Sequence, residues 1–369
     1  MNLLKTKRNK KAFYNLSVYL MIIFAYILVV VLKSQGMLSS LMEGLLVPLC
    51  TYSILAVSLN LVVGISGELS LGHAGFMCVG AFSSAIFTRY MKFLGMQGLY
   101  LFIIAILIGA LTAGIIGLLI GIPVLRLKGD YLAIVTLAFG EIIKNIVNAI
   151  WLGFDTNGVH LSLRNAQALN LAKENNFIVV KGAQGITGTP HYSSFEAGII
   201  LLLIVVTIVI NLVNSRTGRN IKALRDNRVA AESVGISSMK YKLIAFTIAS
   251  SMAGVAGVLY AHNLTTLQAL PNTFGYNVSI NILVFVVLGG MGRIRGSIIA
   301  AVVLTLLPEM LRGLQDFRML IYSIVLIVVM IFTSAPAIKQ YMEVLKHKFP
   351  ILNGLKISMM IRGKNKEGE

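Results

Sequence analysis

Charged residues are scarce in this sequence: only 12% of its 369 residues are Asp, Glu, Lys or Arg. A soluble globular protein carries about 25%, so an ordinary water-facing surface is excluded. Cysteine is also rare, and Cys50 and Cys78 both lie in apolar segments, which argues against a disulfide framework or a cysteine metal site. The sequence has no Walker-type phosphate loop, metal-ligand cluster or dinucleotide fingerprint. We therefore expect that the chain binds no cofactor and does not itself hydrolyse ATP.

Apolar runs of about 20 residues recur from end to end, in a chain that is 57% hydrophobic. That is the length needed to cross a hydrocarbon core of about 30 Å, and such runs must be helices because no water satisfies their backbone. The sequence predicts an all-α, polytopic transmembrane bundle of about ten spans. They are placed at 16–32, 44–65, 71–88, 99–122, 131–152, 195–214, 243–262, 278–291, 296–311 and 319–335.

The basic residues, which give a net charge of +18, are distributed unevenly about these spans. With the N-terminus inside, 23 of the 32 Lys and Arg fall in inner segments, eight fall in outer segments, and Lys144 lies within a span. This bias predicts that both termini are cytoplasmic. It divides the chain into a basic N-terminal segment 1–15, a transmembrane permease domain 16–335 and a basic tail 336–369. The basic loops lack interleaved aromatic residues, so lipid head groups are their expected partner and nucleic acid is not.

Two loops are longer than a minimal turn requires. The outer loop 153–194 is polar. The inner loop 215–242 is basic and patterned as a short helix, with apolar positions such as Ile221 and Leu224 among its arginines. Such a helix either lies at the lipid interface or forms a docking surface for a cytoplasmic partner.

Two glycine-rich breaks interrupt the apolar runs, at 61–76 and 288–296. Irregular backbone at membrane depth is tolerated only where protein covers it or where it lines a wet cavity. Paired breaks in the two halves of a chain indicate a transport pathway, whereas the alternative is a pair of tight turns with small residues for close packing. The candidate pathway residues are Gly64, Ser66, Gly67, Ser70, Gly72, His73, Gly289, Gly290 and Gly292.

Two charged residues, Glu141 and Lys144, lie three apart inside the fifth predicted span. This spacing allows them to pair across one helical turn, which reduces the cost of placing either charge in the membrane. They are either a structural pair or a polar point on the transport route.

The segment Gly64–Gly67 also matches the Gly-x-Ser-Gly pattern of intramembrane serine proteases, in which Ser66 needs a histidine base such as His73 or His262. A pattern of only four residues is weak evidence for a protease.

Four stretches of the sequence together resemble the M-type (LivM-like) permease family of branched-chain amino-acid ABC importers. They are LNLVVG at 59–64 with LSLGHAG at 69–75; KGDYLAIVTL at 128–137; GRNIKALRDN at 218–227 with AAESVG at 230–235; and VVLGGMG at 286–292 with LLP at 306–308. The third stretch is similar to the coupling loop of ABC permeases, although Val229 stands where the family pattern has Glu. The resemblance assigns ATPase coupling to Arg225, Asp226, Ala230, Ala231, Glu232 and Gly235.

The resemblance implies a multi-pass subunit of the bacterial cell membrane that moves branched-chain or related apolar amino acids by alternating access. It implies four kinds of partner: a homologous permease subunit, two cytoplasmic ABC ATPases that bind the ATP, an extracytoplasmic substrate-binding protein and the lipid bilayer. Thr136 joins the candidate pathway residues, because its hydroxyl is suited to a zwitterion. A permease for urea or another small solute, and a stand-alone secondary transporter, are the alternatives.

Overall fold

The structure is a computed structural model that describes residues 2–96, 98–127, 129–155, 158–165, 167–169, 177–311 and 317–334. The chain forms two compact units, Met1–Leu306 and Leu307–Glu369. The predicted tail 336–369 lies outside the described residues, and the described helix of the second unit is α13 (Arg318–Ser334).

Every predicted apolar run coincides with a helix. The long helices of the first unit are α1 (Asn2–Ser34), α2 (Ser40–Asn60), α3 (His73–Phe93), α4 (Leu99–Val124), α5 (Asp130–Ala149), α6 (Phe195–Asn214), α9 (Ser238–Ala261) and α11 (Tyr276–Gly289), together with α12 (Ile294–Met310) as far as Leu306. In the described part of the chain, seven segments are long and apolar enough to cross a membrane, and α3, α12 and α13 are not among them. The chain is therefore a mostly helical protein with several candidate membrane spans.

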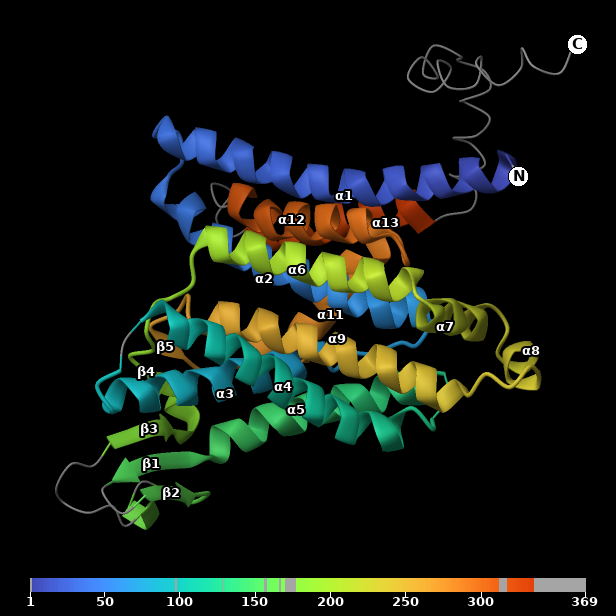
Figure 1. Cartoon of the computed structure of the whole chain (residues 1–369). Helices are drawn as coiled ribbons and strands as arrows, with labels where there is room; N and C mark the ends of the chain where they lie inside the picture. The colour runs from blue at the N-terminus through green and yellow to red at the C-terminus, as the bar shows by residue number, and fades with distance from the viewer. Residues whose placement is uncertain are drawn as a thin grey trace, which may run out of the picture. The chain divides into compact units, whose positions relative to one another are not determined.

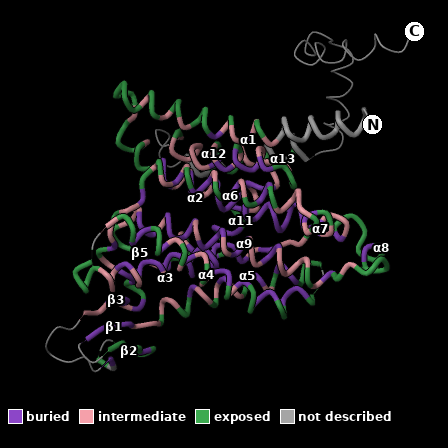
Figure 2. The backbone as a smooth tube through the Cα atoms, in the orientation of Figure 1, coloured by how far each residue is buried: buried purple, intermediate pink, exposed green. Residues whose placement is uncertain are grey.

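The helices α3, α4 and α9 pack backbone to backbone through glycines, and α3 and α9 are largely buried in Figure 2. A Cβ placed on Gly80 would lie 2.3 Å from the carbonyl oxygen of Gly254, and one on Gly254 would lie 2.4 Å from that of Gly109. A Cβ on Gly257 would lie 2.0 Å from the carbonyl oxygen of Met77. Small residues let membrane helices approach this closely, so these glycines form the core of the first unit.

The prediction of an all-α fold is wrong in one region, the outer loop. There β1 (Trp151–Asp155) pairs antiparallel with both β2 (Gly158–Ser162) and β3 (Phe177–Lys181), giving the order β2-β1-β3. A second pair joins β4 (Ile186–Thr187) to β5 (Thr266–Leu267). The predicted span 131–152 accordingly stops at Ala149, because the aromatic and branched residues that follow suit a strand. Two short 3-10 helices, η2 (Gln167–Leu169) and η3 (Gly182–Gln184), complete this region.

The strands lie at one end of the helices of the first unit, and the inner loop lies at the opposite end, as Figure 1 shows. The single short helix predicted within 215–242 is in fact two helices, α7 (Arg216–Asp226) and α8 (Arg228–Ser233). They separate at Asn227, whose side chain accepts a hydrogen bond from the amide of Ala230 at 3.0 Å and so begins the second helix. The start of α1 lies at the α7–α8 end, and residues 2–15 of the predicted basic segment form the first part of this helix.

Candidate functional site

The first glycine-rich break is a single π-helical turn, η1 (Leu61–Ser66), that ends α2. It ends at Gly67, whose φ of 77° is a left-handed conformation that favours glycine. The chain then continues without regular structure until α3 begins at His73. A π-helical turn is an interruption that proteins often keep at functional sites.

The two breaks meet at one side chain, the fully buried amide of Asn60. Its Nδ2 donates to Oγ of Ser297 at 2.8 Å, and its Oδ1 accepts from the amide of Gly292 at 2.7 Å. A Cβ on Gly64 would lie 2.2 Å from that same amide nitrogen, so the two segments touch through backbone. Asn60 is not among the residues predicted from the sequence, although a lone asparagine in an apolar run is a visible signal.

Several predicted pathway glycines lie in close backbone contact. A Cβ on Gly72 would lie 2.6 Å from the carbonyl oxygen of Thr136, whose hydroxyl accepts from the amide of Leu71 at 3.0 Å. A Cβ on Gly289 would lie 2.4 Å from Gly296. These contacts agree with the alternative interpretation, in which small residues allow tight packing. Gly290 has a left-handed φ of 90° and is half-buried at the end of α11, so it fits a tight turn. The role of these residues in a pathway stays a prediction.

Three polar side chains of the first break are buried: Ser66, Ser70 and His73. The Ser70 hydroxyl and both ring nitrogens of His73 have no hydrogen-bond partner in the described part of the chain. Buried polar atoms are almost always paired with protein or water, so these groups are suited to water or a passing solute. Among the described residues, Ser66 and His73 do not form the hydrogen-bonded pair of a serine protease, and the ring of His262 contacts Thr88 and the Val258 carbonyl instead.

The inner helix α7 reaches the first break through Arg225. Its Nη1 donates to the carbonyl oxygen of Gly64 at 3.0 Å, while its Nε and Nη2 donate to Asp226 Oδ1 at 3.1 and 2.8 Å. A second link is the ion pair between Glu68, just beyond the break, and Lys242 at the start of α9. The break is therefore held by charged side chains from the end of α7 and from the start of α9.

The short helix α8 presents apolar surface away from the bundle. Ala231 is buried, whereas Val229 and Val234 are 78% and 74% exposed. Arg228 and Glu232 form an ion pair at 2.9 Å beside them. Gly235 follows the helix with a φ of 85°, a left-handed conformation that favours glycine. A Cβ added there would meet no described atom within 4 Å, so the backbone conformation favours glycine and the available space does not require it.

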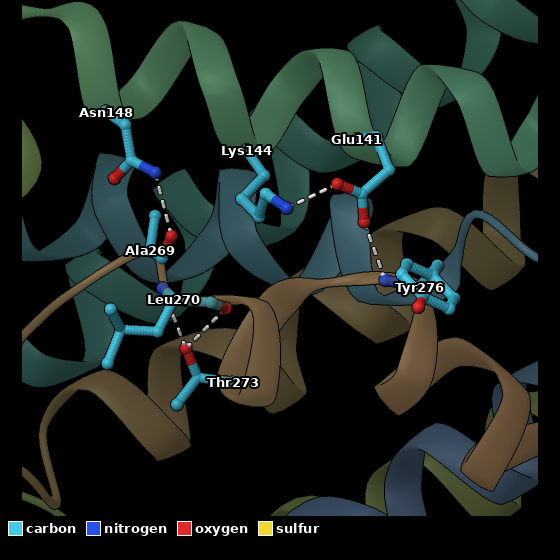
Figure 3. Close-up of polar contacts among 7 residues, drawn as sticks. All are labelled: Glu141, Lys144, Asn148, Ala269, Leu270, Thr273 and Tyr276. Carbon is cyan, nitrogen blue, oxygen red and sulfur yellow. Dashed lines mark hydrogen bonds and ion pairs between the residues drawn. The ribbon is translucent and has the colours of Figure 1, made fainter.

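The expected pairing of Glu141 with Lys144 is confirmed, and Figure 3 shows what the sequence could not reveal. The second oxygen of Glu141 accepts the amide of Tyr276 at 2.7 Å, so this carboxylate binds the N-terminus of α11. Further along α5, Nδ2 of Asn148 donates to the carbonyl oxygen of Ala269 at 2.9 Å. The polar face of α5 therefore holds the irregular segment that precedes α11.

The chain is a helical membrane bundle in which two breaks touch. Charged side chains connect the first break to the inner loop, which carries the exposed helix α8. This is the architecture of a transport permease. The chain belongs to the family described as the branched-chain amino acid transport system permease component, whose model matches residues 41–334.

Three relatives place the chain within this family. It is 36% identical to the high-affinity branched-chain amino acid transport system permease protein LivM of Escherichia coli (strain K12), over 76% of this chain and 66% of that protein. It is 22% identical to LivH of the same organism, over 69% and 79%. It is 26% identical to the fructose import permease protein FruG of Bifidobacterium longum, over 40% and 46%. The chain thus spans slightly less than two thirds of LivM, and no solved structure matches it.

Replacing Asn60 with leucine should separate the two breaks. The amide of Gly292 loses its acceptor, and the hydroxyl of Ser297 loses one of its two hydrogen bonds and keeps the one that it donates to the carbonyl of Arg293. The net contribution of one hydrogen bond is about 0.5–1.5 kcal/mol. We expect a lower melting temperature and faster hydrogen exchange at Gly292. The matched control is Ser58→Ala on the same helix, since the buried Ser58 hydroxyl donates to the carbonyl of Leu55 within its own turn. Equal effects of the two substitutions would contradict the bridging role of Asn60.

Proposed function

We propose that this chain is a permease subunit of an ABC importer in the bacterial cell membrane, moving branched-chain or related apolar amino acids inward. The chain crosses the membrane ten times with both termini in the cytoplasm. Transport proceeds by alternating access, and the chain does no chemistry on its substrate. The observation that carries the proposal is the link from the exposed helix α8 through Arg225 to the broken end of α2.

Separate proteins supply the remaining parts of the importer. Two cytoplasmic ATPases bind and hydrolyse ATP, a homologous permease subunit completes the route, and an extracytoplasmic binding protein delivers the substrate. The similarity to both LivM and LivH, two permease proteins of one organism, supports a homologous partner. The outer loop with its three-stranded sheet is the surface that we assign to the binding protein.

The inner loop transmits the motion of the ATPases. Val229 and Val234 offer apolar surface at the end of the molecule where the basic residues gather, as a docking helix requires. Displacement of α7 and α8 pulls on the carbonyl of Gly64 through Arg225, while Lys242 of α9 holds Glu68 beside the break. Asn60 passes this movement to the second break at Gly292.

Two other transport functions compete with this proposal. A permease for urea or another small solute would share the architecture, and FruG is a family relative whose name states a sugar. A stand-alone secondary transporter would need no ATPase. The exposed apolar helix α8 and its charged links to the break favour an ATP-driven partner.

The function is tested by reconstituting the chain with its partner permease, ATPases and binding protein in proteoliposomes. We expect ATP-dependent accumulation of radiolabelled leucine, competed by isoleucine and valine and not by urea or fructose. ATPase subunits that lack their catalytic carboxylate should abolish uptake. Uptake that proceeds without ATP and follows an ion gradient would refute the proposal.

Replacing Arg225 with alanine should uncouple ATP hydrolysis from uptake. A hydrogen bond to a charged group is worth about 1.5–3 kcal/mol, so we expect roughly a tenfold or greater loss of uptake per ATP hydrolysed. Arg225→Lys retains one donor and should recover part of the coupling. Arg219→Ala is the matched control, because Arg219 is exposed on the same helix and its guanidinium donates to nearby Asn214 at 3.4 Å. Normal coupling in Arg225→Ala would overturn the transmission route.

The orientation is tested with single cysteines at two exposed valines at opposite ends of the bundle. Val159 in β2 and Val229 in α8 are 65% and 78% exposed, and the native Cys50 and Cys78 are buried. In intact cells, a membrane-impermeant maleimide should label Val159→Cys, and it should label Val229→Cys only after permeabilisation. The reverse pattern would place the docking helix outside the cell and would exclude an ABC importer as the function.

A further inference from the structure

The helix α11 begins level with the middle of α5 rather than with one of its ends. Glu141 lies eleven residues after the first residue of α5, about 16 Å along a helix that rises 1.5 Å per residue. This is close to the centre of a hydrocarbon core of about 30 Å. Figure 3 shows that Glu141 accepts the amide of Tyr276, so α11 starts level with this point of α5. The preceding segment, which includes the short helix α10 (Pro271–Phe274), therefore lies at membrane depth.

Polar side chains are exposed on α5 and α11 close in sequence to the contact of Glu141 with Tyr276, and this set is called the α5–α11 seam. Asn145 lies one turn after Glu141 on α5, Asn277 follows Tyr276 directly on α11, Asn281 lies one turn later, and all three are exposed. The side chain of Glu141 is 25% exposed. None of the three asparagine side chains has a hydrogen-bond partner in the described part of the chain, so their amides are free to bind other groups.

Other helices of the first unit expose a different chemistry at the same depth. Across its middle, α4 exposes Ile103, Leu107, Leu111 and Ile115, and α6 exposes Ile200, Ile204 and Ile208. Those faces suit lipid tails. Polar residues within membrane segments instead face protein or a water-filled cavity, and irregular backbone at that depth follows the same rule. The α5–α11 seam is therefore not a lipid-facing surface.

We propose that the α5–α11 seam, formed by Glu141, Asn145, Asn277 and Asn281, lines the aqueous route of the substrate and faces the homologous permease subunit. This inference rests on the proposed function and adds to it the residues that line the route. The route passes midway along α5, beside the end of the first break, because a Cβ on Gly75 would lie 2.7 Å from the Cα of Gly140, the residue before Glu141.

The chemistry of the seam suits an apolar amino acid. Asparagine amides donate to a carboxylate and accept from an ammonium group, and the exposed edge of Glu141 attracts the ammonium group further. Ile142, Ile146 and Ile280 lie exposed among these polar groups and offer apolar surface to a branched side chain. Lys144 is buried behind Glu141 and pairs with it, which keeps the local charge balanced.

The test is water accessibility in the assembled transporter, in a background without Cys50 and Cys78. Cysteines replace Asn145, Asn277 and Asn281, and the matched controls Leu111→Cys and Ile204→Cys lie near the middles of α4 and α6. Assembly with the partner subunits, checked by co-purification, shows that each variant folds. A charged methanethiosulfonate reagent reacts with the thiolate and needs water. We expect seam cysteines to react at least tenfold faster than the controls, and leucine to slow labelling at Asn277→Cys.

Labelling of the seam as slow as that of the controls would overturn the proposal. So would a seam cysteine that cross-links to the partner subunit yet resists the water-soluble reagent, because the interface is then dry. Fast labelling without protection, in a transporter that takes up leucine, would also overturn it. An assembled transporter that labels fast and takes up no leucine would support the water-lined seam and refute the amino-acid assignment alone.

Discussion

Water is absent from the middle of a bilayer, so every backbone group that leaves a helix there needs a partner within the protein. In this chain the partners are a few side chains placed at the interruptions. Asn60 pairs with Gly292, Thr136 with Leu71, and Glu141 with Tyr276. Each of these bonds joins two segments of the bundle, so the groups that satisfy the backbone also determine how the helices are arranged.

The molecule thereby combines two kinds of helix contact. Glycines bring α3, α4 and α9 into backbone contact, and close packing of this kind resists deformation because there is no space to move into. Arg225 is joined to the break by one hydrogen bond and Asn60 joins the two breaks by two, and such bonds can break and re-form. A motor acting on the inner loop is expected to move the polar junctions and to leave the glycine-packed group intact.

The helical segments could be predicted well from the sequence because each apolar run has the length that the bilayer imposes. The pair of Glu141 and Lys144 could be predicted too, since spacing along one helix is a local property. The pairing of β4 with β5 could not, because it joins residues distant in sequence, such as Thr187 and Thr266. For the same reason the partners of Asn60 could not be predicted, nor could the hydrogen bond between Glu141 and the start of α11.

The position of Glu141 has a consequence for biogenesis. Its ion pair with Lys144 lies within one helix, so α5 is able to enter the bilayer as an electrically neutral segment before later parts of the chain are synthesised. The hydrogen bond to Tyr276 forms later, because Tyr276 lies 135 positions further along the chain. The carboxylate is thus already positioned when α11 emerges from the ribosome, and the final docking of α11 becomes a late event in assembly.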